Sequence, residues 1–149
     1  LSAVAGVANT SALIGFGNSA TGVSALSSTI NLASLSNFAF SCPRAGTISS
    51  LAAYFSVTVG ISLTTNVIIT AYIYTSSAPS NSFTLAASLD LPTLSGLISL
   101  GSTVFNSTSL GLTVSANTRI VLIFAMRTSS TLDLLTTITG YASAGISIN

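Results

Sequence analysis

The chain has 149 residues and only five formal charges, three Arg and two Asp, with no His. Charged residues make up 3% of the sequence, whereas a typical soluble domain carries about 25%. A net charge of +1 cannot form the basic surface that binds phosphates or anionic lipids, so we expect no nucleic-acid partner.

The sequence is too apolar to be disordered. Hydrophobic residues make up 49% of it and the mean hydropathy is +0.83, whereas disorder requires low hydrophobicity and high charge. Ser and Thr supply 48 residues, so the polar part of the chain consists mainly of neutral hydroxyls. A surface of this kind has little charge repulsion, which favours association over a monomeric state.

The chain is predicted to hold one domain, residues 13–149, behind a short lead-in segment, residues 1–12. The lead-in is made of small, largely apolar residues. It has three interpretations: a flexible linker, a stalk, or a strand donated to a neighbouring subunit.

The stretch Leu51–Tyr74 has no charged residue, and a hydropathy window would mark it as membrane-spanning. Its apolar residues nevertheless alternate with Ser, Thr and Tyr, which predicts strands rather than a lipid-facing helix. We expect strands over Leu51–Leu63 and Val67–Thr75, a turn at Thr64–Asn66, and therefore a long hairpin that does not enter a membrane.

The other predicted strands are short and separated by turn residues. Ile120–Met126 is apolar without a break, which is typical of a strand buried on both faces. Leu132–Ile138 could form one helical turn, and Val23–Leu35 is ambiguous between helix and strand. The remaining strands are expected at Asn37–Cys42, Phe83–Leu91, Leu97–Phe105, Leu110–Val114, Arg119–Arg127 and Thr137–Ile148. This pattern predicts an all-β fold, an antiparallel β-sandwich that is jelly-roll-like.

The chain lacks the residues that most catalysis requires. Without His, Lys or Glu, the acid–base groups are limited to Asp90 and Asp133, and no serine has a histidine partner. Metal sites built on His and Cys are excluded, and calcium at Asp90 or Asp133 stays as a minor alternative. We therefore expect no enzyme, no catalytic residue, no cofactor and no metal. The single Cys42 is predicted to be a small buried hydrophobe on a strand, the alternative being a bridge between subunits.

Several stretches resemble a known family. NFAFSCPRAGTISSLAAYFS at Asn37–Ser56, the turn Gly15–Ser19 and the closing GYASAGISI at Gly140–Ile148 are similar to the C-terminal domain of the exosporium glycoprotein BclB family. That resemblance implies a trimeric, jelly-roll-like head of the complement-globular-head and tumour-necrosis-factor kind. In that family the head follows a collagen-like stalk at the spore surface, although this chain has no collagen triplets.

The expected function is therefore structural: a self-assembling domain that caps a collagen-like stalk on the exosporium, with other copies and other spore-surface proteins as partners. A subunit of a spore-surface fibre is the first alternative. A module that binds glycans or host surfaces, through Tyr54, Tyr72 and Tyr74, is the second. The residues predicted to form the oligomer interface, or the core beside it, are Val67, Ile69, Ile73, Ile120, Leu122 and Phe124.

Overall fold

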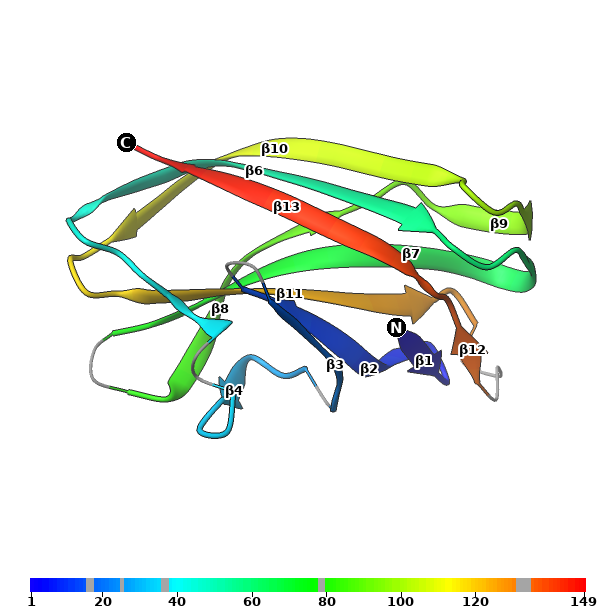
Figure 1. The fold of residues 1–149 in the computed structure, drawn as a ribbon, viewed down its shortest axis with the longest axis horizontal. Helices are drawn as coiled ribbons and strands as arrows, with labels where there is room; N and C mark the ends of the chain where they lie inside the picture. The colour runs from blue at the N-terminus through cyan, green and yellow to red at the C-terminus, as the bar shows by residue number, and fades with distance from the viewer. Residues whose placement is uncertain (16–17, 25, 36–37, 78–79, 131–134) are drawn as a thin grey trace.

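The computed structural model describes residues 1–15, 18–24, 26–35, 38–77, 80–130 and 135–149. Within these ranges the chain forms β-strands joined by turns and irregular segments (Figure 1). In chain order the strands are β1 (Ser2–Val4), β2 (Val7–Ile14), β3 (Ser19–Ser24), β4 (Thr29–Asn31), β5 (Phe40–Ser41), β6 (Gly46–Val57), β7 (Ile61–Ser76), β8 (Ser82–Asp90), β9 (Leu94–Ile98), β10 (Thr103–Val114), β11 (Arg119–Thr128), β12 (Thr136–Thr137) and β13 (Gly140–Ile148).

The strands form two antiparallel sheets of unequal width. The larger sheet has the order β12-β1-β2-β11-β7-β8-β4, with β3 paired to β2, β5 to β11 and β9 to β7. The smaller sheet has the order β10-β6-β13 and packs over the centre of the larger one (Figure 1). This arrangement confirms the predicted all-β class and the antiparallel sandwich.

The predicted hairpin over Leu51–Tyr74 is wrong, although both halves are strands. The chain turns at residues 58–60, after β6, and β6 and β7 belong to different sheets. Thr64–Asn66 lies inside β7, where the register against β9 shifts between Leu63 and Val67. Threonine favours strands, and Thr64 and Asn66 are exposed while Thr65 is half-buried, so the polar run marks the exposed part of a strand and not a turn. None of the described residues belongs to a helix long and apolar enough to span a bilayer.

The predicted strand Leu97–Phe105 is also wrong, because the chain turns within it. β9 ends at Ile98 and β10 begins at Thr103. Gly101, in the turn, has a φ of 84°, a left-handed conformation that favours glycine.

The core between the sheets comes from alternate residues of β6 and from β7 and β11. On β6 the inward residues are Ile48, Leu51, Ala53, Phe55 and Val57, all buried. The strands β7 and β11 pair over ten residues, from Arg119 opposite Ser76 to Thr128 opposite Val67. Leu13, Leu32, Phe83, Val121 and Ile123 form a second buried cluster on the outer side of the larger sheet. Because β11 contributes to both clusters, its apolar run is buried on both faces, as predicted, except that Leu122 is half-buried.

The segments whose structure could not be decided from the sequence lie mostly in the larger sheet. The lead-in, residues 1–12, contributes β1 and most of β2, and the Leu1 amino group donates a hydrogen bond to the Ile138 carbonyl at 3.1 Å. The ambiguous segment Val23–Leu35 contains the end of β3 and all of β4. Residues 132–134 of the possible helical turn lie outside the described residues, and residues 136–137 form β12.

Two glycines of β13 provide a matched test of this packing. A Cβ at Gly140 would overlap the Ser56 carbonyl oxygen and lie 2.5 Å from ring atoms of Phe55, whereas a Cβ at Gly145 would meet nothing within 4 Å. We expect Gly140→Ala to lower the free energy of unfolding by about 1–3 kcal/mol, the usual cost of overpacking. Gly145→Ala should leave it unchanged or raise it by about 0.4–1 kcal/mol, because the unfolded chain loses freedom. Urea denaturation of both variants measures the difference, and equal stabilities would contradict the register of β13 on β6.

Candidate functional site

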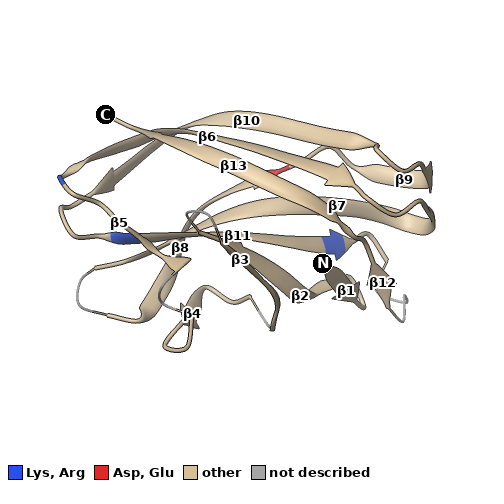
Figure 2. Ribbon diagram, in the orientation of Figure 1, with Lys and Arg blue, Asp and Glu red and all other residues tan. Residues whose placement is uncertain are grey.

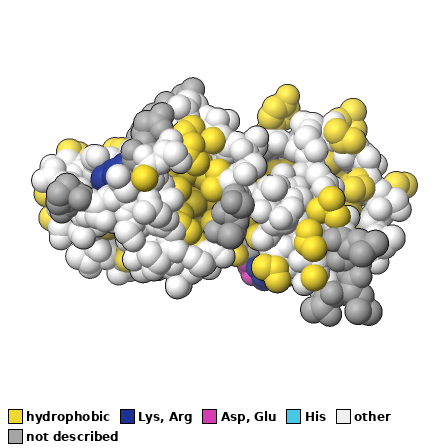
Figure 3. Space-filling model, turned by 90° about the horizontal axis from the view of Figure 1, so that it is seen from below, with side chains coloured by type: hydrophobic (Ala, Val, Ile, Leu, Met, Phe, Trp, Pro, Cys, Tyr) yellow, Lys and Arg dark blue, Asp and Glu magenta, His cyan; other side chains and the backbone are white. Residues whose placement is uncertain are grey.

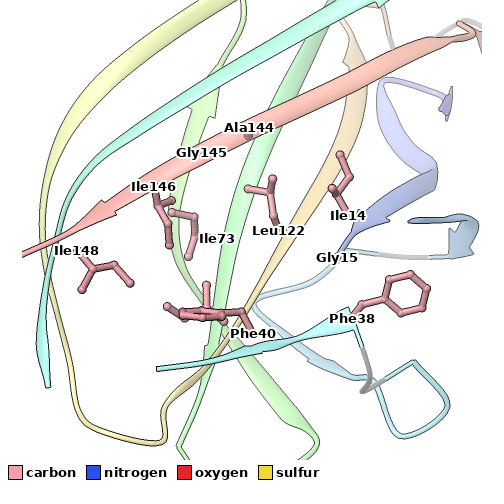
Figure 4. Close-up of a pocket in the computed structure, with 11 residues that line it drawn as sticks. Ile14, Gly15, Phe38, Phe40, Ile73, Leu122, Ala144, Gly145, Ile146 and Ile148 are labelled. Carbon is pink, nitrogen blue, oxygen red and sulfur yellow. The ribbon is translucent and has the colours of Figure 1, made fainter. Parts of the chain in front are cut away.

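An apolar cleft opens along one side of the sandwich, beneath the edge strand β13. Its volume is about 330 Å³. The lining residues are Ile14, Gly15, Phe38, Phe40, Ile73, Ile120, Leu122, Ala144, Gly145, Ile146 and Ile148, all of them apolar. Figure 4 shows the side chains of Ile146 and Ile148 on one side, those of Leu122 and Ile14 on the other, and that of Phe40 below them. Seen from below, hydrophobic side chains form a patch left of centre and several separate groups on the right (Figure 3).

The cleft exists because the smaller sheet ends too early to cover the larger one. β13 pairs with β6 on one side, and none of the described strands pairs with its other side. The larger sheet continues past this edge, from β11 into β2 and β5. The floor residues Ile73 and Ile120 are buried, but Ile14 and Leu122 are only half-buried. An edge of this kind presents unpaired backbone groups as well as open apolar side chains.

The outer face of the smaller sheet carries three exposed aromatic side chains, one on each strand, with Tyr54 on the central strand between the other two. Phe105 pairs with Tyr54 across β10 and β6, and Tyr141 pairs with Ser56, two positions from Tyr54. Because these residues have the same strand parity, their side chains lie on one face. Phe105 is 68% exposed, Tyr54 39% and Tyr141 76%. We call Tyr54, Phe105 and Tyr141 the aromatic face.

The surroundings of the aromatic face are neutral and rich in hydroxyls. β6, β10 and β13 contain no charged residue. The Ser147 hydroxyl lies 2.6 Å from that of Ser49 and 2.8 Å from that of Ser50, which joins β13 to β6. Beside Tyr54 and Phe105 the surface has a shallow hollow of about 480 Å³, which Ser107 and Ser143 also line.

No charged residue lines the cleft or belongs to the aromatic face. Among the described residues, charged side chains occur in β8, at the two ends of β11 and between β5 and β6 (Figure 2). Arg127 binds Asp90 at 2.7 Å, and the Thr70 hydroxyl donates to the same carboxylate at 2.6 Å. The hydrogen bond from Arg127 lowers the pKa of Asp90 and raises that of Arg127. The predicted alternative of calcium at Asp90 would have to displace this pair, and Asp133 lies outside the described residues.

No described part of the chain gathers three or more His, Cys, Asp or Glu side chains in a group that could hold a metal. Cys42 is buried, as predicted, and follows β5 directly. Burial raises the pKa of its thiol, so the reactive thiolate is disfavoured. A bridge from Cys42 to another subunit would require this part of the chain to open.

The six residues predicted to form an interface or the core are divided between two places. Val67, Ile69 and Phe124 are buried in the core between the sheets. Ile73, Ile120 and Leu122 line the cleft.

The predicted exposed tyrosine cluster is wrong. Tyr74 is buried and donates a hydrogen bond from its hydroxyl to the Ser27 carbonyl at 2.7 Å. Tyr72 lies beside it, with ring centroids 6.4 Å apart, whereas Tyr54 belongs to the other sheet. Sequence reasoning missed Phe105 and Tyr141, whose positions among alternating Ser, Thr and Asn residues are the signal of an outward face.

No protein-family model matches the chain, and a search of curated proteins finds no significant match. The similarity to the exosporium family therefore stays a prediction from the sequence stretches that carry it.

The Asp90–Arg127 pair should make stability dependent on pH only in acid. The folded pKa of Asp90 lies below its ordinary value of 3.8, so its contribution is present above that value and lost as the pH falls through the folded pKa. Both side chains are partly exposed, at 50% and 41%, so we expect Asp90→Asn to cost at most about 1 kcal/mol at neutral pH. The cost should vanish in strong acid.

Urea denaturation at neutral pH and well below pH 3.8 measures this effect. Arg44→Gln is the matched control, because Arg44 donates a hydrogen bond to the neighbouring Ala45 carbonyl and forms no ion pair among the described residues. A cost for Asp90→Asn that persisted in strong acid would show that the pair does not act through the charge of Asp90.

Proposed function

We propose that this chain is a structural, self-assembling surface domain, and that the aromatic face is one of its contact surfaces. The observation that supports this proposal is the contiguity of Tyr54, Phe105 and Tyr141 on an uncharged sheet face. Contiguous exposed apolar patches typically mark interaction sites. Aromatic side chains contribute strongly to such contacts because they bury a large area at little conformational cost.

The low charge of the chain also supports association between identical copies. Copies with a net charge of +1 repel each other weakly, and the hydroxyl groups around the aromatic face can pair across an interface at little desolvation cost. A catalytic function has no comparable support, because the described charged groups are few and Asp90 is already paired with Arg127.

The location and the architecture of the assembly follow from the resemblance. We propose that the domain lies at the spore surface, in the exosporium, as a trimeric, jelly-roll-like head of a collagen-like filament protein. A subunit of a spore-surface fibre is the alternative within the same structural role. Both versions require contact between copies.

A glycan-binding module is a second candidate, because the aromatic face adjoins the hollow lined by Ser107 and Ser143. An aromatic ring beside hydroxyl groups is a suitable arrangement for a sugar, which has both apolar and hydroxyl faces. Binding of glycans by the monomer, abolished by Tyr54→Ser, would favour this candidate over self-assembly.

The double variant Phe105→Ser/Tyr141→Ser tests the contact surface. We expect its apparent dissociation constant for self-association to rise by about thirtyfold or more, as for the loss of central aromatic anchors. Sedimentation and multi-angle light scattering over a range of concentrations measure the change. Stability should hardly change, because both side chains are largely exposed.

Val7→Ser is the matched control, because Val7 is comparably exposed on β2, in the larger sheet. A wild-type chain that stayed monomeric at every concentration would contradict self-assembly. Unchanged association of the double variant would contradict only the role of the aromatic face.

A further inference from the structure

A second apolar feature projects from one end of the sandwich. Val59, in the turn after β6, is 58% exposed, and Leu97 and Leu100, on β9 and in the turn after it, are 81% and 71% exposed. The two turns lie side by side, because the Val57 carbonyl accepts a hydrogen bond from the Gly101 amide at 2.8 Å. We call Val59, Leu97 and Leu100 the apolar projection. Figure 1 places these turns at the end of the molecule where β9 lies.

The backbone holds this projection in place. On β9 the side chains alternate, so Leu97 faces outward while Leu94 and Ile98, on the other face of the strand, are buried. Ile98 pairs with Ile61 of β7. Leu97 is therefore exposed on an anchored strand, and with Val59 and Leu100 it adds apolar surface at this end of the molecule.

The cleft beneath β13 has the chemistry to receive such a projection. All its lining side chains are apolar, its volume is about 330 Å³, and sites that receive ligands measure roughly 300–1,000 Å³. No residue of the projection lines the cleft, so the two surfaces can be occupied at the same time. Neither surface includes a charge, so their contact leaves no ion desolvated.

We propose that the apolar projection of one copy inserts into the cleft of the next copy. The proposal rests on the self-assembly proposed above and names a second contact for it. The unpaired edge of β13 borders the cleft, so backbone groups of the incoming turn can pair there while Leu97 and Leu100 fill the space below. Leu122 and Ile14, half-buried in the single chain, become buried on insertion.

The contact joins two different surfaces, so it is heterologous. A heterologous contact repeats from copy to copy and produces a ring if the rotation closes, or a filament if it does not. The aromatic face lies on the other side of the smaller sheet from the cleft and remains available for a separate contact.

A complementation experiment tests the insertion. All chains carry Phe105→Ser/Tyr141→Ser, which removes the aromatic face. One variant adds Leu97→Ser/Leu100→Ser and so loses the projection but keeps the cleft. The other adds Ala144→Phe, which fills the cleft but keeps the projection. Each variant alone should lose self-association, with an apparent dissociation constant raised by about thirtyfold or more.

An equal mixture of the two variants should form dimers that do not grow further, because only one projection and one matching cleft remain between them. Sedimentation velocity measures the masses, and circular dichroism with thermal unfolding verifies the fold of each variant. Leu122→Asn replaces Ala144→Phe if the latter does not fold. Leu135→Ser, a change of an exposed leucine outside the projection, is the matched control and should leave association unchanged.

The outcomes separate the two proposals. Variants that associate as strongly as their parent chain, or a mixture that stays monomeric, would overturn the insertion. Assembly of the wild type that disappears completely with the aromatic face would overturn the insertion and leave the proposed function standing. A monomeric wild type would overturn both.

Discussion

The unequal width of the two sheets is the constraint on which the other features depend. A sheet with an apolar inner face must be covered to its edges, but β10-β6-β13 covers only the centre of the larger sheet. The outer side of the larger sheet is covered differently, by Leu32 and other residues between β3 and β5 that pack on Phe83 and Ile123. The uncovered strip therefore lies on one side, beneath β13, and leaves apolar side chains open to water at a cost of about 25 cal/mol per Å². An occupant recovers this free energy.

Because charged residues are scarce, the free edges of the smaller sheet lack the charges that usually protect strand edges. Proteins commonly protect free strand edges with Lys, with other inward-pointing charges or with proline. Here β10 and β13, the two edges of the smaller sheet, contain none of these residues. Hydroxyl groups keep such edges hydrated but do not repel a second strand. A chain of this composition therefore has few charges at its open edges to oppose association.

Most strands could be predicted from the sequence, but the pairing between strands could not. Alternation along Leu51–Val57 identified the inward face of β6 correctly, and the unbroken run Ile120–Met126 identified a strand buried on both faces. Strand parity says which residues share a face, but it does not say which sheet the strand enters. For that reason β6 and β7 were expected to pair with each other.

The surfaces that matter for contact were even less accessible from sequence. The cleft is lined by residues from β2, β5, β7, β11 and β13, and its existence depends on how far the smaller sheet extends. Tyr74 packs in the outer buried cluster, and its hydroxyl donates a hydrogen bond to the carbonyl of Ser27, 47 positions earlier in the chain. Neither the lining of the cleft nor this long-range hydrogen bond can be predicted from the local sequence pattern.

One strand, β13, connects the two proposed contact surfaces. Its inward residues Ala144, Ile146 and Ile148 line the cleft, while Tyr141 points to the opposite side and belongs to the aromatic face. The strand is held on β6 by its backbone pairing and by the Ser147 hydroxyl, and its other edge has no partner among the described strands. An occupant of the cleft would add a partner at that edge and restrict the motion of β13. Because Tyr141 moves with the strand, the same occupant would also order the aromatic face, and the second contact would then form at a lower cost in conformational entropy.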